Sequence, residues 1–553
     1  MSPAWAGVGE LAILLAALAV VYRPLGDYLA HVFTTPKHWR VERAIYRFAH
    51  VNPESEQRWT TYGYGVLGFS FAGVVLLYLM QRLQPMLPLA FGHAAVAPSM
   101  AFNTSVSFVT NTNWQSYVPE TTLGSTVPML GLTVQNFLSA AVGIVVAIAL
   151  IRGFVRSQTD RLGNGWVDIV RVTVRVLLPM SFLFAIVLVG LGVVQSLRSG
   201  TTVTGLDGTQ HTLALAPGAS EESIKELGTN GGGIFNANSA HPFENPSGWT
   251  NLIEIFLILV IPVSLTRTLG VLVGNKKQGY TLLSVMAVLW GLMLTLVWWA
   301  ESHPTGKAAL LAGAGTEGKE TRFGINASSL FVNTTTSTST GAVNAAHDSL
   351  SGLGGGGAML NMMFSEMTPG GVGTGIYSIL VMAIIAVFLA GLMVGRTPEY
   401  LGKKLGRREV TMASIAILAM PTLVLVLAGA AIALPATASA MNNSGAHGFS
   451  EVLYAYTSAS NNNGSAFAGI TVTSDFFQST LGVAMTFGRF VPIIAVLCLA
   501  GALASQRKVP ATAGTLPTSG PLFASMVTFT IVLVAAIVFV PALALGPIAE
   551  AVS

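Results

Sequence analysis

Long apolar segments alternate with short polar ones along the whole chain. A helix needs about 20 largely apolar residues to cross the hydrocarbon core of a bilayer. Ten segments meet this criterion, at about residues 7–30, 62–83, 124–151, 170–195, 250–274, 279–300, 361–395, 411–434, 474–504 and 521–545. The pattern therefore predicts an all-α polytopic membrane protein with ten transmembrane helices.

A polar loop rich in Gly, Thr, Asn and Ser recurs four times between these segments, at a spacing of roughly 110 to 120 residues. The loops are 110–115, 228–233, 337–342 and 460–465, and each follows a stretch that could form a short half-helix, at 99–109, 220–227, 327–336 and 448–457. This arrangement predicts four membrane–pore–membrane repeats with pseudo-fourfold symmetry and one extra helix at each end. The predicted units are 1–60, which holds the first span and the loop after it, the repeats 61–151, 170–274, 279–397 and 411–504, and the last span in 520–553.

The four loops have the chemistry of a potassium filter. Non-helical backbone is tolerated at membrane depth only where protein buries it or where it lines a water-filled cavity. Glycines allow backbone angles that point successive carbonyls at one axis, and neutral carbonyl and hydroxyl oxygens can replace the hydration shell of K⁺ without trapping the ion as a carboxylate would. No loop has Asp or Glu at its centre. The candidate filter residues are Thr110, Asn111, Thr112, Asn113, Gln115, Thr229, Asn230, Gly231, Gly232, Ser339, Thr340, Gly341, Asn461, Asn462, Asn463 and Gly464.

Further polar residues flank the first two loops. Gln115 either offers an amide oxygen just outside the ring or is an ordinary surface residue. We interpret a second group, which follows the second loop, as a hydrogen-bonded scaffold for its backbone, because no further His or Cys lies nearby to complete a metal site. This group comprises Asn236, Asn238, His241, Glu244 and Asn245.

Composition limits the remaining possibilities. Of the 553 residues, 9% are charged, whereas soluble domains carry about 25%. The single cysteine, Cys498, lies in an apolar run, so neither a disulfide framework nor a cysteine metal site is available. We find no GxxxxGKS/T nucleotide loop, no Asp-Lys-Thr-Gly phosphorylation sequence and no Ser/His/Asp or Cys/His set. We therefore expect no catalytic residues, no bound nucleotide and no nucleic-acid partner, and any pumping must be driven by another chain.

The basic residues are distributed unevenly between two sets of loops. Cytoplasmic loops of membrane proteins retain Lys and Arg. One set holds 21 of the 28 Lys and Arg residues, Arg489 lies inside a span, and the other set holds six, which are Arg82, Arg198, Lys225, Lys307, Lys319 and Arg322. We therefore expect the first set in the cytoplasm, the polar loops open to the outside and both termini extracytoplasmic, with the first apolar run retained as a span.

The longer segments between the spans also allow predictions of where they lie. The segments 196–226 and 301–330 are polar and poor in aromatic residues, so we expect surface loops over the outer mouth. The segment 31–60 mixes aromatic and basic residues and is expected to lie along the lipid headgroups.

Ionisable residues inside spans are costly and are functional candidates by default. Glu366 and Arg489 lie in the second spans of repeats three and four, and we expect them to form an ion pair. Pro369, Gly370 and Gly371 follow Glu366 and should break the seventh span into two pieces. The broken helix could gate the filter or turn the ion's exit sideways, or the pair could only lock two helices together.

Several longer motifs resemble one known family. They are 108–117 (FVTNTNWQSY), 228–246 (GTNGGGIFNANSAHPFENP), 341–348 (GAVNAAHD), 395–404 (GRTPEYLGKK) and 461–469 (NNNGSAFAG). They are similar to motifs of the KdpA family, the potassium-binding subunits of bacterial Kdp potassium-transporting ATPases, and the resemblance covers nearly the whole chain. It implies filter triplets at 111–113, 229–231, 339–341 and 461–463, with Gln115 beside them. This chain departs at Thr340, where some members carry Cys, but the main-chain carbonyl survives that exchange.

The resemblance has further implications for function. It implies a bacterial inner-membrane location and high-affinity K⁺ uptake with a P-type ATPase subunit (KdpB), a single-span subunit (KdpC) and often a small peptide subunit (KdpF). Potassium would pass through an intramembrane tunnel to KdpB, and Glu366, Arg396 and Arg489 match charged positions of the family. The alternatives are a self-sufficient Trk-like potassium channel, a secondary carrier, which needs a roomy polar midplane pocket, and a membrane enzyme, which needs a catalytic constellation.

Overall fold

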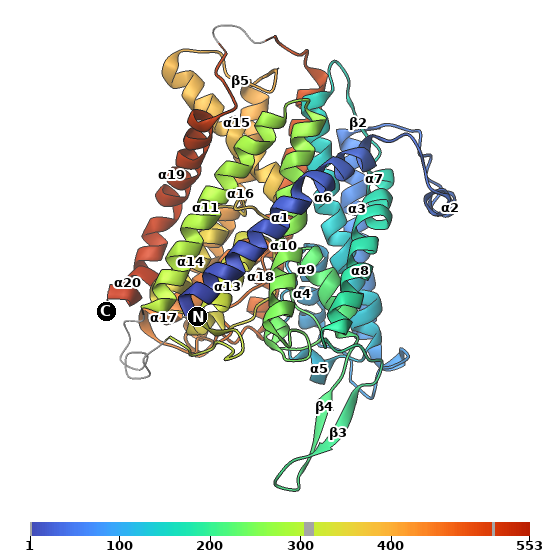
Figure 1. Cartoon of the computed structure of the whole chain (residues 1–553), viewed down its shortest axis with the longest axis vertical. Helices are drawn as coiled ribbons and strands as arrows, with labels where there is room; N and C mark the ends of the chain where they lie inside the picture. The colour runs from blue at the N-terminus through green and yellow to red at the C-terminus, as the bar shows by residue number, and fades with distance from the viewer. Residues whose placement is uncertain (1–2, 304–314, 511–514, 553) are drawn as a thin grey trace.

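The computed structural model describes residues 3–303, 315–510 and 515–552. These residues contain ten helices long and apolar enough to cross a membrane, as the sequence predicts. They form one bundle (Figure 1). The spans are α1 (Pro3–Thr34), α3 (Trp59–Arg82), Val127–Val155 including α6 (Thr133–Val155), Gly165–Gly190 including α7 (Gly165–Val172) and α8 (Leu178–Gly190), α10 (Gly248–Leu272), α11 (Lys276–Ser302), α15 (Thr374–Val394), α16 (Arg407–Ile432), α18 (Asp475–Ser505) and α19 (Pro521–Leu545).

Three spans depart from regular α-helix. The third begins with a π-helical segment, Val127–Leu132, and the fourth contains another, Thr173–Leu177. Hydropathy alone did not predict either segment. The seventh span is broken, as predicted, into α14 (Gly352–Met363) and α15, with the non-helical residues 364–373 between them.

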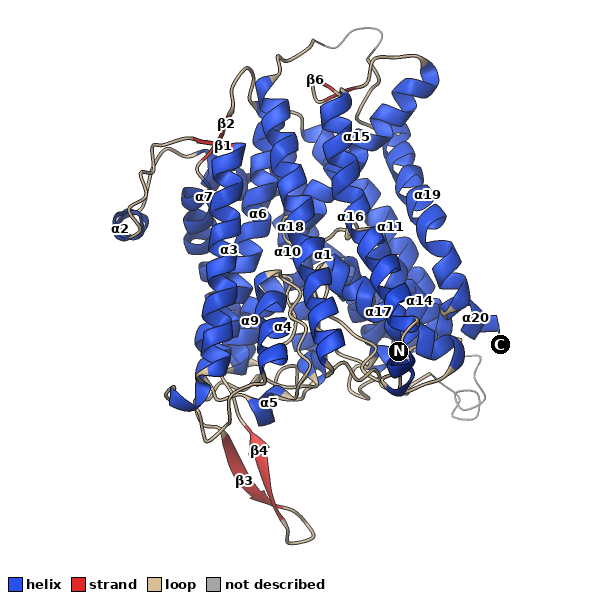
Figure 2. Cartoon of the chain, turned by 180° about the vertical axis from the view of Figure 1, so that it is seen from behind, coloured by secondary structure: helices blue, strands red, loops and turns tan. Residues whose placement is uncertain are grey.

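The four predicted half-helices are present and are longer than expected. They are α4 (Pro98–Val109), α9 (Gly218–Leu227), α13 (Gly324–Ser337) and α17 (Gly445–Asn461). We call them pore helices. Each packs between neighbouring spans: α4 contacts α3 and α18, α9 contacts α8 and α10, α13 contacts α11 and α14, and α17 contacts α16 and α18. All four lie in the same half of the bundle (Figures 1 and 2).

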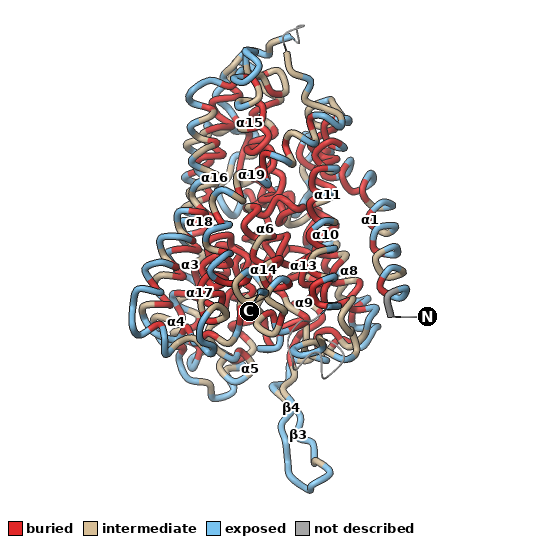
Figure 3. Tube along the Cα trace, turned by 90° about the vertical axis from the view of Figure 1, so that its left-hand side faces the viewer, coloured by how far each residue is buried: buried red, intermediate tan, exposed pale blue. Residues whose placement is uncertain are grey.

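The centre of the bundle is α6. Residues 144–151 of this helix are completely buried. A helix that is apolar all round belongs in a protein interior, and α6 runs through the middle of the buried region, whereas α1 lies at its edge (Figure 3). Two of the four pore helices, α4 and α9, pack directly on this central helix.

Short strands and helices complete the molecule. Three antiparallel pairs join β1 (Gln57–Arg58) to β2 (Arg161–Gly163), β3 (Gly200–Thr204) to β4 (Gln210–Ala214), and β5 (Glu399–Tyr400) to β6 (Lys403–Lys404). The surface loop expected at 196–226 was therefore wrong in part, because β3 and β4 pair there into a projecting hairpin (Figure 2). The remaining α-helices in the described part of the chain are α2 (Arg40–Phe48), α5 (Pro119–Thr122) and α20 (Pro547–Val552).

The two ends of the bundle differ. The N- and C-termini lie at the same end as the β3–β4 hairpin, and β5 lies at the opposite end (Figure 1). The position of both termini at one end agrees with an even number of membrane-spanning helices. α2 lies at the margin of the bundle, where its buried Glu42 pairs with Arg175, and its Phe48 is exposed (Figure 1). Lys307, one of the six basic residues expected outside, falls in a segment beyond the described residues.

Candidate functional site: a ring of four pore loops

Each pore helix ends at one of the four predicted polar loops. α4 ends at Val109, α9 at Leu227, α13 at Ser337 and α17 at Asn461. The carbonyl end of a helix carries about half a negative charge, which favours a nearby cation. Four such ends converge on the loops, so the site attracts a cation without using a carboxylate.

Contacts between the loops close them into a ring. Asn111 Nδ2 of loop 1 donates to the Thr229 carbonyl of loop 2 at 2.7 Å. Loops 2 and 3 approach so closely that a Cβ on Gly231 would lie 2.3 Å from the carbonyl carbon of Gly341. The ring continues from loop 3 to loop 4 through Asn463 Nδ2, which donates to the carbonyl of Thr338 at 2.8 Å.

The fourth junction returns to the start of the chain. Asn462 Nδ2 of loop 4 donates to Thr112 Oγ1 of loop 1 at 3.0 Å. Loop 4 also packs on loop 1 at Gly464, whose Cβ, if present, would lie 1.8 Å from the Thr112 carbonyl oxygen. The predicted filter residues of all four loops are therefore in contact around one centre.

Unusual backbone angles shape the loops. Asn111, Asn113, Thr229 and Asn462 all have φ between +48° and +65°. Asn adopts this left-handed conformation more readily than most residues, and here the Asn side chains bond to other segments. Asn113 Nδ2, for example, donates to Asn136 Oδ1 at 2.8 Å. In loop 3 the Thr340 carbonyl accepts from Thr335 Oγ1 at 2.6 Å, so that carbonyl is turned toward its own pore helix.

A small cavity of about 170 Å³ forms a mouth over the ring. All four loops line it, through Asn113, Gly232, Gly341 and Gly464. Gln115 also lines this cavity, and its Oε1 accepts from the Gly233 N–H at 2.7 Å. Gln115 therefore both faces the mouth and holds loop 2.

A buried charge cluster supports loop 2 from behind. Lys225 of α9 lies among five fully or almost fully buried carboxyl groups, from Glu221, Glu222, Glu226, Glu244 and Glu254. Burial raises the pKa of Glu221 to about 8, with Lys225 acting in the opposite direction. The cluster therefore places one buried ammonium group and several buried carboxyl groups directly behind loop 2.

Asn238 joins this charge cluster to loop 2. Its Oδ1 accepts from Lys225 Nζ at 3.1 Å and its Nδ2 donates to the Gly232 carbonyl at 2.7 Å. The scaffold role expected for the segment after loop 2 is thus confirmed at Asn238. Asn245 Nδ2 similarly donates to Asn251 Oδ1 at 3.1 Å.

The break in the seventh span is docked directly on loops 2 and 3. The Val372 N–H donates to Thr229 Oγ1 at 3.1 Å, and the Gly370 N–H donates to the Ser337 carbonyl at 2.9 Å. Ser339 Oγ donates to a carboxyl oxygen of Glu366. The predicted glycines are required here, because Gly370 has φ +81° and a Cβ on Gly371 would lie 2.4 Å from Ser339 Oγ.

Comparison with known proteins places this geometry in a family. The family model described as KdpA, the potassium-transporting ATPase A subunit, matches residues 12–552. The chain belongs to the KdpA family. Relatives named potassium-transporting ATPase potassium-binding subunit include that of Mycobacteroides abscessus, 59% identical over 100% of both chains, and that of Streptomyces coelicolor, 58% identical over 100% of this chain and 99% of its own.

A solved structure shares the KdpA fold at low sequence identity. The crystal structure of the potassium transporter TrkH from Vibrio parahaemolyticus matches with a TM-score of 0.50 and 14% identity. The match covers 86% of this chain and 97% of TrkH. At this identity the likeness concerns the fold alone.

The predicted ion pair between Glu366 and Arg489 was wrong for this KdpA chain. Arg489 Nη2 donates to the Ser139 carbonyl at 3.2 Å, and Glu366 is turned toward Ser339 instead. Among the described residues the two side chains form no direct ion pair. The third charged candidate, Arg396, lies exposed just beyond the end of α15, a helix of 21 residues that separates it from the break.

Sequence reasoning missed one face of α6 that contacts loops 1 and 2 and the break in this KdpA chain. Ser139 Oγ donates to Asn111 Oδ1 at 2.8 Å, and the Asn136 carbonyl accepts from Asn230 Nδ2 at 3.0 Å. Gly143 lets the break approach, since its Cβ would lie 2.4 Å from the Val372 carbonyl oxygen. Residues 136, 139 and 143 share a helix face, so two polar residues and a glycine in an apolar span were the available signal.

Proposed function

We propose that this chain is the potassium-binding and selectivity subunit of an ATP-driven, high-affinity K⁺ uptake complex. The observation that carries the proposal is the closed ring of four pore loops, joined by Asn111, Asn462 and Asn463. Its centre is neutral, and four pore-helix carbonyl ends face it. Neutral oxygens in a ring can replace the hydration shell of K⁺ without holding the ion permanently.

The amide bonds between loops support discrimination by fixing the ring's size. An ion of another size could be accommodated only if these buried bonds lengthened. A buried polar group that loses its partner costs about 1–3 kcal/mol. The ring therefore resists a change of size at several junctions at once.

The broken seventh span supports a sideways exit for the ion. Residues 364–373 pack on loops 2 and 3 and against Gly143 of α6. A chain segment in this position obstructs a straight path out of the ring. In the proposed mechanism K⁺ enters from outside, sheds its water in the ring and leaves laterally through an intramembrane tunnel to the P-type subunit KdpB.

The proposed assembly contains KdpB, KdpC and KdpF in a bacterial inner membrane. The names of the relatives, which call them subunits of a potassium-transporting ATPase, support an ATP-driven complex. The excess of Lys and Arg on one set of loops supports extracytoplasmic termini and an outward-facing ring.

A second candidate is a self-sufficient, Trk-like potassium channel. The fold shared with TrkH raises this alternative, but a shared fold does not by itself imply a shared function. Such a channel needs an open path from the ring to the cytoplasm, whereas three hydrogen bonds hold the break against the loops here.

Uptake of ⁸⁶Rb⁺ into proteoliposomes separates these two functions. We expect uptake when this chain is reconstituted with its ATPase partner and ATP, and none when ATP or the partner is omitted. Rapid uptake by the chain alone would favour the passive channel. The absence of uptake in every condition, together with no ⁸⁶Rb⁺ binding to the complex, would contradict both.

A further inference from the structure

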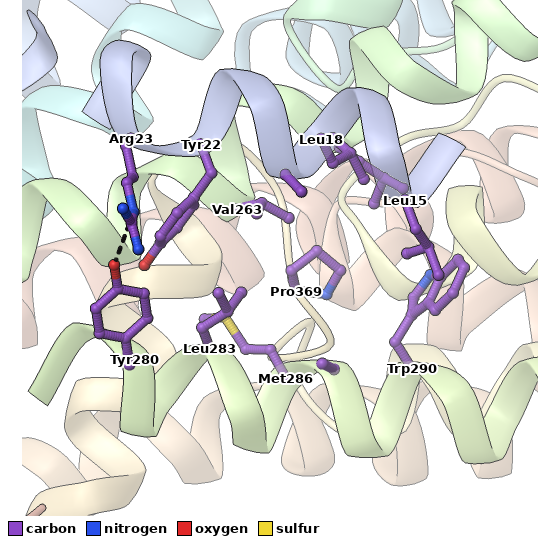
Figure 4. A pocket seen from close by; sticks show the side chains of 13 residues that line it. Leu15, Leu18, Tyr22, Arg23, Val263, Tyr280, Leu283, Met286, Trp290 and Pro369 are labelled. Carbon is purple, nitrogen blue, oxygen red and sulfur yellow. Dashed lines mark hydrogen bonds between the residues drawn. The ribbon is translucent and has the colours of Figure 1, made fainter. Parts of the chain in front are cut away.

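An apolar groove runs along the outside of the bundle between α1 and α11. Its cavity volume is about 510 Å³, and α10 forms its floor. Leu15 and Leu18 of α1 face Leu283 and Met286 of α11 across it (Figure 4). Pro369, from the break in the seventh span, also lines the groove, so its occupant would touch the segment that is docked on the pore loops.

The length of the groove matches one leaflet of a bilayer. Along α11 it extends from Tyr280 to Trp290, which is about 15 Å at 1.5 Å per residue. The hydrocarbon core of a bilayer is about 30 Å thick. A partner helix that crossed the membrane would need a groove of about twice this length, whereas one acyl chain of a single leaflet fits.

Positive charge gathers at one end of the groove. Arg23 is exposed there, and its Nε donates to Tyr280 Oη at 3.2 Å, which leaves both terminal NH₂ groups available (Figure 4). Lys276 and Lys277 begin α11 close by. Asp27, the acidic group that Arg23 and Lys276 also approach, is already bound by Arg267 at 2.7 Å.

The lining excludes the groove as a path for K⁺. Apart from the hydroxyls of Tyr22 and Tyr280 beside Arg23, the lining side chains offer no oxygen that could replace water around the ion, and the guanidinium of Arg23 repels it. An amphiphile with an apolar tail and an anionic head has the complementary arrangement, because Arg binds phosphate through several N–H groups.

We propose that this groove holds one acyl chain of an anionic phospholipid, with the phosphate on Arg23 and the chain lying along α11 toward Pro369. The lipid would fill the space behind the break and hold residues 364–373 against loops 2 and 3. Lipid binding does not depend on the potassium function proposed above, because it can be measured without any transported ion.

Quenching of Trp290 by bromine tests this site. Trp290 lines the groove and is 8% exposed. The full chain is reconstituted with phosphatidylglycerol or phosphatidylcholine carrying brominated acyl chains, and the quenching that disappears in Trp290→Phe is assigned to the groove. We expect half-maximal quenching of Trp290 at a mole fraction at least fivefold lower for phosphatidylglycerol than for phosphatidylcholine.

Two variants test the contributions of the lipid headgroup and of the acyl chain separately. Arg23→Gln should abolish the preference for phosphatidylglycerol, and Ala287→Phe, which fills the groove, should reduce quenching by both lipids. Arg47→Gln on the distant helix α2 is the matched control and should keep the preference. Equal quenching by the two lipids, or an unchanged preference in Arg23→Gln, would overturn the proposal. So would loss of Trp290 quenching when the ATPase partner is bound, because the partner would then occupy the groove.

Discussion

Single asparagine side chains hold the pore loops together. Asn111, Asn462 and Asn463 each donate an amide N–H across a loop boundary, and all three are buried. Such a hydrogen bond contributes about 1 kcal/mol net to stability, but a buried polar group left without its partner costs about 1–3 kcal/mol. The ring is therefore sensitive to changes that separate its loops by even a few tenths of an ångström.

Gly231→Ala tests this sensitivity where loops 2 and 3 meet. The added Cβ would lie 2.3 Å from the backbone of Gly341, so one loop must move. We expect the half-saturating ⁸⁶Rb⁺ concentration of the complex to rise at least tenfold, which corresponds to about 1.4 kcal/mol.

The matched control for this change is Gly291→Ala in α11. Nothing lies within 4 Å of the Cβ position there, so the affinity for ⁸⁶Rb⁺ should not change. Unaltered affinity in Gly231→Ala would mean that loops 2 and 3 do not need their close approach.

At the scale of elements, hydropathy was sufficient to predict most of the architecture. The ten spans, the four pore helices and the break at Pro369 follow from local patterns of apolar residues, glycine and proline. The β3–β4 hairpin and the π-helical segments were missed, because they are short and carry no apolar period of their own. The partners of the loop asparagines were missed as well, since they lie up to 350 residues away in the sequence.

The short C-terminal helix α20 is tied to the fourth pore helix by one histidine. His447 of α17 bonds through Nδ1 to Glu550 at 2.9 Å and through Nε2 to Asp348 at 3.2 Å. Two carboxylates raise the pKa of His447 from 6.5 to about 10. The folded protein therefore binds this proton more tightly than the unfolded chain does.

His447→Gln should consequently destabilise the protein in a pH-dependent way. The stabilisation by His447 is fully present below pH 6.5 and is lost as the pH rises through about 10. We expect a loss of about 2 kcal/mol at pH 6, the value of hydrogen bonds to charged groups, and no difference above pH 10. Thermal unfolding of the complex at several pH values measures this loss of stability. His211→Gln in the exposed hairpin is the control. An equal loss at all pH values would exclude the charged pair as its cause.

At the scale of the whole molecule, the two ends of the bundle are chemically distinct. The hairpin and the termini lie at one end, and β5 lies at the other (Figure 1). The bundle has an orientation in the membrane that a chemical label can report, because the chain has a single cysteine, Cys498, which can be replaced by serine.

Cysteines placed at the two ends test the predicted orientation. Leu206 at the tip of the hairpin and Ser157 after α6 are both exposed. In a Cys498→Ser background, we expect a membrane-impermeant maleimide to label Leu206→Cys in intact cells and Ser157→Cys only after permeabilisation. The reverse pattern would invert the proposed topology.

The hydrogen bond between Asn462 and Thr112 also limits when the ring can close during biosynthesis. The two residues are 350 positions apart, and a ribosome adds about 5–20 residues per second. Roughly 20–70 s therefore pass between synthesis of the first quarter of the ring and arrival of the residue that closes it. During that interval Thr112 lacks its bond from Asn462, so a nascent chain that stalls before its last repeat leaves the ring open at this junction.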